Sequence, residues 1–340
     1  MPGIGIVGCG YWGPNLIRNF ASLSECEVRK VCDSDAERLA HIKGLYPALE
    51  TTCEFEEVLK DGQVDAVVIA TPVRYHFEMA KKALLAGKHT FVEKPMASSL
   101  VECQELVEIA ESGNLTLMVG HTFVYSTPVR RIKEIVDSGE LGEIQYISAR
   151  RLNLGLFQKD INVAWDLAPH DISIILYVLN ETPTSVNCQG KAHVNAKIED
   201  VTNMTLNFAG GSLATVHSSW LDPNKVREIT FVGNKKMLVY DDIEPNEKIK
   251  IYDKRVDIPP HYDTFAEFQY SYHYGDMYAP YLKMVEPLRV ECGHFLDCIK
   301  TGTKPHSGGA EGLQVIEVLE AASQSLKKGG AAVEISGGKG

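Results

Sequence analysis

The chain lacks any apolar run of about 18 or more residues, the length that a membrane-spanning helix needs. It also lacks a basic leader, because Met1 and Pro2 run directly into the apolar segment Ile4–Val7, and we therefore expect no signal peptide. Long blocks of Lys and Arg are missing and the net charge is −11, so nucleic-acid binding is not expected. Together these absences predict a cytoplasmic protein.

Metal-binding patterns are missing as well. None of the eight cysteines forms a Cys-x-x-Cys pair. Cys32 and Cys188 lie in apolar, strand-like segments, and Cys292 and Cys298 lie on a predicted helix. Free, buried thiols in a reducing compartment explain them better than a disulfide framework does. No metal site is predicted, because metal-ligand spacing is also absent among His217, His261, His273 and His294.

What the chain does contain, up to residue 122, is a regular alternation of short apolar runs and amphipathic segments. Phe77, Ala80 and Leu84 recur at the three- and four-residue intervals of a helix. Continuous apolar strands separated by helices indicate a parallel sheet that is covered on both faces. We therefore predict an α/β domain over residues 1–122. Its strand candidates are Ile4–Val7, Val28–Cys32, Ala66–Ala70, Thr90–Glu93 and Leu115–Val119.

Residues 123–340 show a different pattern and are predicted to form an α+β domain with a large, mostly antiparallel open sheet. Strand-like segments follow one another without intervening helices, and glycine turns mark hairpins. Residues 257–287, rich in Pro, Tyr and His, are expected to form a long ordered loop, and a Gly-rich tail follows Ser336. The predicted helices are 128–138, about 168–180, 287–301 and 309–328, and the strands are 144–151, 185–191, 201–208, 211–219, 227–232, 236–240 and 248–252.

A glycine pattern follows the first strand and opens the first helix, in the segment Gly8-Cys9-Gly10-Tyr11-Trp12-Gly13. This context predicts a Rossmann domain in which Gly8 permits a tight turn and Gly10 lets backbone amides approach a pyrophosphate. Gly13 would let the helix pack close to the strand. The N-terminus of that helix would then present unpaired N–H groups to the phosphates.

The second strand ends at Asp33, which stands 20 residues after Gly13. An acidic side chain at this place accepts hydrogen bonds from the adenosine ribose hydroxyls and repels a 2′-phosphate, so NAD is favoured over NADP. Asp33 has an alternative role as the cap of the following helix, although Ser34 or Asp35 would serve that purpose too. Arg38, on the next helix, leaves the phosphate preference open.

Three further segments carry a resemblance to a known family. The third strand runs out into Ala70-Thr71-Pro72-Val73-Arg74-Tyr75-His76, the fourth into Glu93-Lys94-Pro95, and the later segment Trp165–Ser173 has an Asp followed four residues on by a His. With the glycine pattern, these motifs resemble those of the Gfo/Idh/MocA family of sugar and cyclitol oxidoreductases. The resemblance covers nearly the whole chain and implies a nicotinamide-dependent oxidoreductase.

The resemblance implies that Lys94, Asp166 and His170 surround the reacting carbinol. A histidine is suited to removing the hydroxyl proton while hydride leaves for the nicotinamide. Lys94, kept cationic by Glu93 or by the substrate oxygen, would stabilise the developing alkoxide. Asp166 would orient the imidazole or bind a neighbouring hydroxyl if the helix has begun before it.

Each of the three residues also has a structural, non-catalytic alternative role. Lys94 can be an ordinary lysine at a strand end, Asp166 the N-cap of a helix that begins at about Ala168, and His170 a satisfied core histidine. The sequence departs from the common family pattern at one position. Many members carry a second Asp three residues after the His, where this chain has Ser173, and Asp171 is adjacent to the His instead.

By the same resemblance, other residues are candidates for cofactor and substrate contacts. Thr71, Pro72 and His76 would lie beside the nicotinamide half of the cofactor. Further cofactor candidates are Tyr11, Trp12, Arg38, Glu93, Lys94 and His121. Arg150, Arg151 and Asn153, at the end of a second-domain strand, have surface or packing roles as their alternative. A substrate diphosphate would need cations, for which Arg150, Arg151, Lys159 and Arg289 are available.

The family handles inositols, sugars and nucleotide sugars, so membership alone does not fix the substrate. Trp165–Ser173, Glu286–Cys292 and Tyr274-Gly275-Asp276 look most like members that oxidise C3 of UDP-N-acetylglucosamine (UDP-GlcNAc), or of its uronic acid, in surface-polysaccharide and amino-sugar biosynthesis. The resemblance also implies a homodimer or homotetramer formed through the second-domain sheet. Alternating apolar residues on the exposed face of Val201–Ser219 would fit such an interface.

Three other functions stay open on the sequence alone. The first is NAD-dependent oxidation of an inositol or a free sugar. The second is glycoside hydrolysis through a transient 3-keto sugar with tightly bound NAD. The third is a non-catalytic nucleotide-sensing protein, against which the joint presence of Lys94 and His170 speaks.

Overall fold

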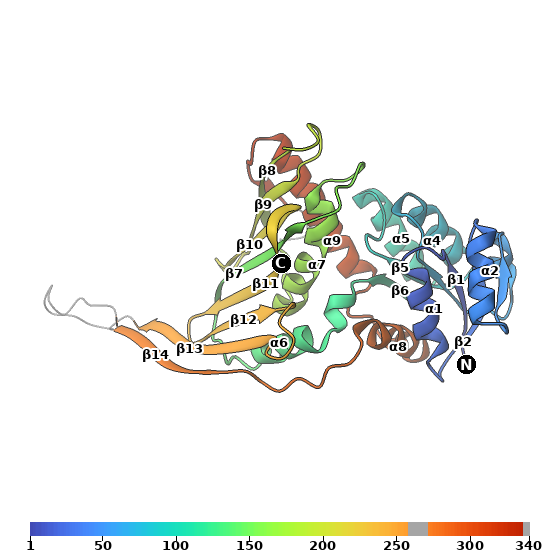
Figure 1. Ribbon diagram of the computed structural model, residues 1–340, viewed down its shortest axis with the longest axis horizontal. Coiled ribbons are helices and arrows are strands. Elements are labelled where there is room, and N and C mark those ends of the chain that lie inside the picture. Colours follow the sequence, from blue (N-terminus) through green and yellow to red (C-terminus); the bar gives the residue numbers. More distant parts are fainter. Residues whose placement is uncertain (258–270, 336–340) are drawn as a thin grey trace, which may run out of the picture. The chain divides into compact units, whose positions relative to one another are not determined.

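The computed structural model describes residues 1–257 and 271–335, which form two compact units (Figure 1). The first unit comprises residues 1–126 and 285–317, and the second comprises residues 127–284 and 318–340. The boundary expected at residues 122 and 123 differs from this division, because the chain returns to the first unit near its end. His261 and the Gly-rich tail lie outside the described residues.

The first unit is built on a six-stranded sheet, here called sheet A, whose strand order is β3-β2-β1-β4-β5-β6. The strands are β1 (Gly3–Val7), β2 (Glu27–Cys32), β3 (Glu50–Thr52), β4 (Ala66–Ile69), β5 (His89–Glu93) and β6 (Leu117–Gly120). The helices are α1 (Gly13–Ala21), α2 (Ala36–Leu45), α3 (Phe55–Lys60), α4 (His76–Leu85), α5 (Leu100–Ser112) and α8 (Pro287–Thr301), with short 3-10 turns η1 (Val73–Tyr75) and η2 (Thr122–Tyr125).

All neighbouring strands of sheet A are parallel. Every residue of β1 and β4 is buried, as expected for central strands that are covered on both faces. The strand order reverses between β1 and β4, and right-handed crossovers then place the helices that follow them on opposite faces. The carboxyl ends of β1, β2, β4, β5 and β6 therefore meet at one edge, where open α/β sheets bind ligands.

The segment that returns to the first unit completes its core. Helix α8 packs against α1 and against η2. At the outer edge of sheet A, the Val119 N–H donates to the Ser307 carbonyl over 2.8 Å and the Ser307 hydroxyl donates to the Val119 carbonyl over 2.7 Å. Phe295 on α8 meets Phe20 and Phe91 edge to face, with ring centroids 6.4 and 5.7 Å apart. These contacts explain why residues 285–317 belong to the first unit.

The second unit contains a nine-stranded sheet, here called sheet B, with the order β14-β13-β12-β11-β7-β10-β9-β8-β15. Its strands are β7 (Ile144–Leu154), β8 (Ser185–Lys191), β9 (Val201–Asn207), β10 (Leu213–Ser219), β11 (Leu221–Gly233), β12 (Met237–Asp241), β13 (Ile249–Asp257), β14 (Ser271–Tyr278) and β15 (Val333–Glu334). Its helices are α6 (Thr127–Asp137) and α7 (Val163–Leu179), and α9 (Gly309–Lys327) passes from the first unit into the second.

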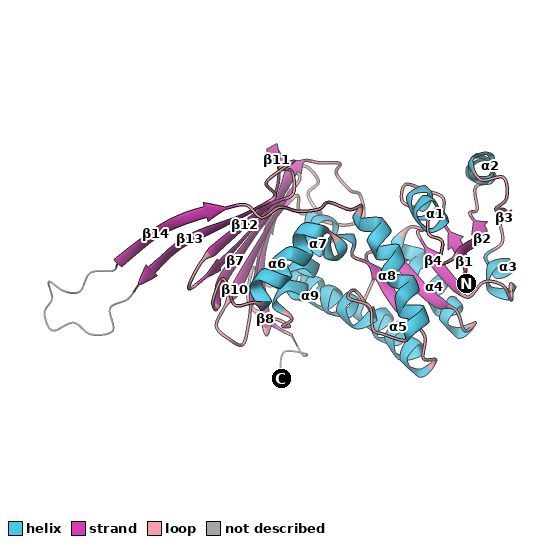
Figure 2. Cartoon of the chain, turned by 90° about the horizontal axis from the view of Figure 1, so that it is seen from below, coloured by secondary structure: helices cyan, strands magenta, loops and turns pink. Residues whose placement is uncertain are grey.

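The neighbouring strands of sheet B are antiparallel except for β7 and β10, which confirms the mostly antiparallel open sheet. Helices α6 and α7 and the C-terminal part of α9 lie on one side of the sheet (Figure 2). Within the residues that the structure describes, no helix covers the other side. The long loop expected over residues 257–287 is wrong in part, because β14 forms within it and pairs with β13.

The uncovered face of sheet B is more polar than the sequence pattern predicted. On β9 and β10, every second side chain is buried. These buried residues are Thr202, Met204 and Leu206 on β9, and Ala214, Val216 and Ser218 on β10. The other face carries Asn203 and His217, among other polar residues. Apart from Val201 and Leu213, the apolar residues of these two strands lie on the buried face, so the expected apolar stripe on the exposed face is reduced to these two residues.

In the described part of the chain, we find no helix that combines the length and the apolar character required to cross a membrane.

Candidate active site

The glycine loop after β1 is packed so closely that two of its positions need glycine. Gly8 has a φ of +99°, and a Cβ there would lie 2.7 Å from the carbonyl carbon and oxygen of Ala70. A Cβ on Gly13 would lie 2.0 Å from the Gly8 carbonyl oxygen. Gly10 is different, because a Cβ there would have only the Arg38 guanidinium within 4 Å, at 3.9 Å. Gly10 thus leaves open space for the close approach of a ligand.

The N-terminus of α1 is suited to an anion. Trp12 is the N-cap residue, but its side chain makes no capping hydrogen bond, and the first turn contains no acidic residue. Pro14 has no N–H and the Asn15 N–H donates to the Trp12 carbonyl over 3.0 Å, so what this turn offers an anion is the uncompensated helix dipole and the N–H groups that precede Pro14. Tyr11 and Trp12 project from the loop, 85% and 41% exposed, with their rings edge to face at 5.6 Å. The loop and this helix end together fit a dinucleotide pyrophosphate.

Asp33 lies where the ribose of a bound dinucleotide is expected, at the carboxyl end of β2. It is buried, and its carboxylate accepts hydrogen bonds from the Cys9 N–H over 2.5 Å and from the Asp35 N–H over 2.9 Å. The helix-cap role belongs to Asp35, whose side chain accepts from the Glu37 and Arg38 N–H groups. Asp33 is therefore held by the glycine loop and is not the cap of α2.

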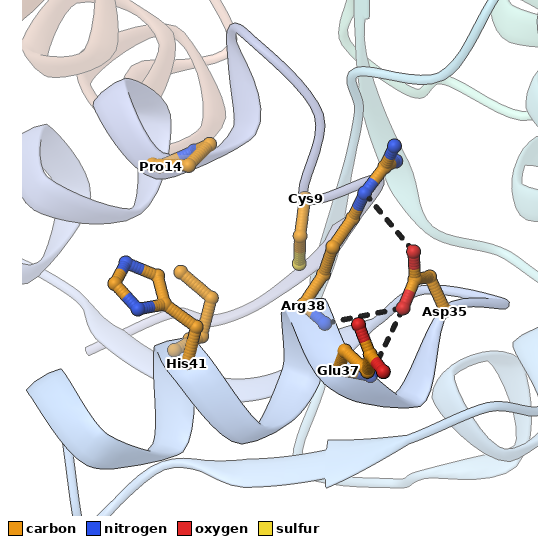
Figure 3. A pocket seen from close by; sticks show the side chains of 7 residues that line it. Cys9, Pro14, Asp35, Glu37, Arg38 and His41 are labelled. Carbon is orange, nitrogen blue, oxygen red and sulfur yellow. Dashed lines mark hydrogen bonds and ion pairs between the residues drawn. The ribbon is translucent and has the colours of Figure 1, made fainter.

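A pocket of about 380 Å³ opens beside this carboxylate and is lined by Cys9, Pro14, Asp35, Glu37, Arg38, His41 and Ile42 (Figure 3). The Arg38 guanidinium contacts Asp35 at 3.3 Å and Asp33 at 3.8 Å, so its charge is opposed by two carboxylates. Burial, with a contribution from Asp33, raises the pKa of the Cys9 thiol to about 12, so Cys9 lines the pocket as a neutral thiol.

The loop after β4 holds Thr71 and Pro72, and His76 follows it at the start of α4. The His76 side chain is buried, with Nδ1 2.8 Å from the Pro95 carbonyl oxygen and Nε2 2.7 Å from the Thr71 carbonyl oxygen. Both ring nitrogens are thus engaged by the protein's own backbone. His76 joins the loops after β4 and β5 and offers neither nitrogen to a cofactor. Thr71 is half-buried, and its hydroxyl contacts the Met79 sulfur at 3.7 Å.

Glu93, Lys94 and His121 stand at the carboxyl ends of β5 and β6, next to each other in sheet A. Lys94 is half-buried, whereas Glu93 and His121 are buried. Burial, partly opposed by Lys94, raises the pKa of the Glu93 carboxyl to about 7. Burial, reinforced by the positive charge of Lys94, lowers the pKa of His121 to about 3. His121 is therefore a neutral imidazole beside the Lys94 ammonium at neutral pH.

Sequence reasoning missed Glu291, which lies on the buried face of α8. Its side chain is fully buried, and Oε2 accepts a hydrogen bond from the Thr122 hydroxyl over 2.8 Å. Burial raises the pKa of this carboxyl well above its usual value, and the charge of Glu93 adds to that shift. The available signal was an acidic residue at helical spacing among the apolar Leu288, Cys292 and Phe295.

In the second unit, Asp166 and His170 lie on one face of α7. The helix begins at Val163 rather than near Ala168, and Asn162 is its cap, with a side chain that accepts from the Trp165 N–H over 3.2 Å. Asp166 is therefore not the cap, and the two residues are one turn apart within the helix. The Asp166 carboxylate accepts a hydrogen bond from the buried Trp220 indole over 3.0 Å, which fixes its position.

The residues after His170 are structural. Arg151 and Asp171 are both buried and form a two-point ion pair, with Nε to Oδ2 at 2.9 Å and Nη2 to Oδ1 at 2.7 Å. The Ser173 hydroxyl donates to the His170 carbonyl over 2.9 Å within the helix. Asp171 therefore does not replace the second Asp that many family members carry, because its carboxylate ties α7 to β7.

Arg150 is separated from Asp166 and His170 by sheet B. Side chains alternate along β7, so Arg151 faces α7 while Arg150 points to the other face, where it pairs with Glu228 at 2.6 Å. The substrate contact at Arg150 stays a prediction, for a side chain that lies on the face of sheet B away from Asp166 and His170. Asn153 is half-buried near the C-terminal end of β7. Two residues later, a Cβ on Gly155 would lie 2.7 Å from the Trp220 side chain. Of the other cations considered, Arg289 contacts Ser22 in the first unit, and Lys159 is exposed before α7.

The chain is similar to several proteins along most of its length. It is 26% identical over 337 residues to the uncharacterized oxidoreductase YrbE of Bacillus subtilis, covering 96% of this chain and 94% of that protein. It is 31% identical over 221 residues to UDP-N-acetylglucosamine 3-dehydrogenase of Acidithiobacillus ferrooxidans, covering 63% and 66%. It is also 22% identical over 342 residues to myo-inositol 2-dehydrogenase of Thermotoga maritima, covering 96% of each chain.

Solved structures have the same fold. The structure of UDP-N-acetylglucosamine 3-dehydrogenase GnnA from Acidithiobacillus ferrooxidans matches with a TM-score of 0.79 at 22% identity, covering 96% of this chain and 98% of that one. An oxidoreductase from Agrobacterium radiobacter, solved in complex with NAD+, L-tartaric acid and magnesium, matches with a TM-score of 0.81 at 19% identity and covers 98% of each chain.

Two family models match consecutive parts of the chain. The oxidoreductase family with an NAD-binding Rossmann fold matches residues 3–121, and the GFO/IDH/MocA C-terminal domain matches residues 129–239. The first match lies in the first unit and the second in the second unit, and the glycine loop and the first turn of α1 fit the dinucleotide that the first model specifies. The chain therefore belongs to the Gfo/Idh/MocA family of NAD-binding oxidoreductases.

Proposed function

We propose that this oxidoreductase uses NAD to oxidise C3 of UDP-N-acetylglucosamine, or of its uronic acid, to the 3-keto sugar. The observation that carries the proposal is the placement of Asp166 and His170 on one face of α7, in a chain whose first unit holds Lys94 at the same edge of sheet A as the dinucleotide loop. The similarity to UDP-N-acetylglucosamine 3-dehydrogenase supports this choice of substrate.

In the proposed reaction, the C–H bond at the carbinol carbon breaks and its electron pair leaves as hydride. NAD supplies the hydride acceptor when it is bound. The imidazole of His170 takes the proton from the hydroxyl, and the Lys94 ammonium stabilises the oxygen as it becomes a carbonyl. Asp166, which the Trp220 indole holds in place, orients His170 or binds the adjacent sugar hydroxyl.

The surroundings of Asp33 support NAD over NADP as the cofactor. A 2′-phosphate would meet the carboxylates of Asp33 and Asp35, and the nearest cation, Arg38, already contacts both of them. Like charges placed together at a binding site cost several kcal/mol, so the two carboxylates disfavour the phosphate. The ribose hydroxyls of NAD would instead donate to Asp33, whose two oxygens retain acceptor capacity.

A spectrophotometric screen for NADH formation tests the substrate. We expect turnover of UDP-GlcNAc or its uronate, and little turnover of N-acetylglucosamine, myo-inositol or free hexoses. Lys159→Ala should then raise KM for the nucleotide sugar if this exposed lysine contacts the diphosphate, with the exposed Lys300→Ala as the control. Turnover of myo-inositol or a hexose, with none of either UDP-sugar, would contradict the substrate choice and favour a function like that of the Thermotoga maritima relative.

We also propose that the chain forms a homodimer or homotetramer through the face of sheet B that faces away from α7. Support comes from the extent of this face, which no helix covers within the described residues. Light scattering coupled to gel filtration measures the assembly directly. A monomeric mass at micromolar concentration would contradict the proposal.

A further inference from the structure

Two buried carboxyl groups lie near the carboxyl ends of β5 and β6, and each has an oxygen that the protein leaves without a hydrogen-bond partner. These oxygens are Oε1 of Glu93 and Oε1 of Glu291, and both side chains are more than nine-tenths buried. Buried polar atoms in native proteins are nearly always hydrogen-bonded, so each unpartnered oxygen needs an explanation. Glu93 is adjacent to Lys94 in the chain, whereas Glu291 reaches this place from α8, near the other end of the sequence.

The two carboxyl groups lie in one part of the first unit. The Glu93 carboxylate is next to Gly120 on β6, where a Cβ would lie 3.0 Å from Oε2. Two residues farther on, the Thr122 hydroxyl donates to Glu291 over 2.8 Å. The charge of Glu93 acts directly on Glu291. The site thus places two acids beside the turn that begins at the end of β6.

The charges around the two acids fix how many protons they hold. Two carboxylates that are close together and out of water cannot both ionise, because each opposes the charge of the other. Lys94 is the cation that acts on Glu93. The remaining titratable groups nearby are neutral: burial lowers the pKa of His121 to about 3 and raises those of Tyr125 and Cys292. One positive charge at Lys94 is thus balanced by one negative charge on the two acids.

We propose that Glu291 is a positioning residue for Lys94: as a neutral acid, its Oε1–H donates to Oε1 of Glu93, and the Glu93 carboxylate in turn holds the Lys94 ammonium. One proton between the two unpartnered oxygens satisfies both of them at once. The hydrogen bond from Thr122 to Oε2 remains in place, because that oxygen keeps its acceptor capacity. Helix α8 thereby becomes part of the support of the catalytic lysine.

This inference rests on the proposed function only for the role of Lys94 in the reaction. A purely structural Glu291, present only to accept the Thr122 hydrogen bond, is the competing interpretation. Three variants separate the two. Glu291→Gln keeps an acceptor for Thr122 and a donor for Glu93, Glu291→Leu removes both, and Thr122→Val removes the Thr122 hydrogen bond while leaving both acids.

Infrared spectroscopy tests the protonation without substrate. The wild-type protein should show a carboxylic-acid C=O band at pH 9, where ordinary carboxyl groups, and Glu93 with its pKa of about 7, are ionised. The band should be lost in Glu291→Gln and kept in Thr122→Val, with circular dichroism confirming that both variants are folded. An unchanged band in Glu291→Gln, or no band in the wild type, would overturn the proposal whether or not the substrate is correct.

Steady-state kinetics then test the positioning role. We expect kcat to fall about tenfold or more in Glu291→Leu, the scale of one lost hydrogen bond to a charged group, with KM for NAD unchanged. The acid limb of its kcat–pH profile should move to higher pH, because Glu93 without a donor holds its proton longer. Glu291→Gln should restore kcat to near the wild-type value, and Thr122→Val should change it little.

A fall in kcat for Thr122→Val equal to that for Glu291→Leu would show a structural role and contradict the proposal. If Glu291→Leu does not fold, the infrared comparison of Glu291→Gln with Thr122→Val still decides the protonation. If no sugar is turned over by the wild type while the acid band behaves as expected, the proposed substrate fails and the carboxyl pair stands.

Discussion

The polar groups of the two units are buried in different ways. Around α7 in the second unit, polar groups have partners: the buried Arg151 of β7 pairs with the buried Asp171 through two hydrogen bonds, and the half-buried Asp166 accepts from the Trp220 indole. At the ends of β5 and β6 in the first unit, Glu93 and His121 are buried with an unpartnered polar atom each. Paired groups hold a helix in place, whereas unpartnered ones have shifted pKa values and stand where ligands bind. The second arrangement is typical of a reaction centre.

The largest effect should come from removing the groups proposed to act on the hydroxyl. Lys94→Ala and His170→Ala should each lower kcat/KM by about 10³-fold, the scale reported for general acid–base and electrostatic groups. Initial rates of NADH formation measure this. Loss of less than tenfold in both variants would place the chemistry elsewhere, and unchanged NAD binding by fluorescence is the control that the first unit remains intact.

Breaking the paired arrangement should affect stability rather than the chemistry. Arg151→Leu leaves Asp171 as a buried, unpaired charge and should lower the free energy of unfolding by about 3 kcal/mol or more. The double variant Arg151→Leu, Asp171→Leu should recover much of this loss, because no charge stays behind. Urea denaturation measures both. A double variant that is less stable than the single one would contradict this reading of the pair.

At the adenosine end of the first unit, Asp33 is the buried carboxylate expected to select NAD over NADP. Asp33→Ser removes the charge expected to repel a 2′-phosphate and frees Arg38 from one of its two carboxylates. The ratio of kcat/KM for NAD over NADP should fall by about 10²-fold, or roughly 2.7 kcal/mol. Parallel assays with the two cofactors give this ratio. A ratio that does not change would show that the carboxylate does not select the cofactor.

The smallest expected effect is a pH dependence of stability from Glu93. Its pKa rises from 4.5 to about 7 on folding, so the unfolded chain loses this proton first as pH increases. The stability that the neutral carboxyl contributes is complete below pH 4.5 and is lost as pH rises through about 7. Glu93→Gln should therefore gain about 2 kcal/mol over the wild type between pH 5 and pH 8. An equal difference at the two pH values would contradict the shifted pKa.

Local sequence predicted the parts of the site that depend on neighbouring residues in the chain. The glycine loop, Asp33 after the second strand, and the placement of Asp166 and His170 one turn apart all follow from spacing and from strand ends. Asn162 shows the limit of this reasoning. A helix start at Val163, five residues earlier than the expected Ala168, removes Asp166 from the cap position, and helix ends are the least certain part of a periodicity pattern.

The parts that were missed depend on contacts between distant residues. The residues near Glu291 in the chain do not indicate that α8 packs beside the end of β6. An acidic residue on the apolar face of a helix suggests a special role for Glu291 but does not identify its neighbours. For Arg150, a shift of one position along a strand reverses the face, so a side chain at a strand end cannot be assigned to the site without the sheet register. For His76, the contacts of its ring with the Thr71 and Pro95 carbonyl oxygens could not be predicted, because they are set by the packing of two loops.

Transfer of a deuterium label tests the central claim most directly. UDP-N-acetylglucosamine carrying deuterium at C3 would be incubated with the protein and NAD. The reduced cofactor and the sugar would then be separated, and the mass of each measured by mass spectrometry. The account predicts that deuterium appears in the reduced nicotinamide and that the sugar becomes a 3-ketone. Label that stays in the sugar, or a product formed without any reduced cofactor, would contradict it.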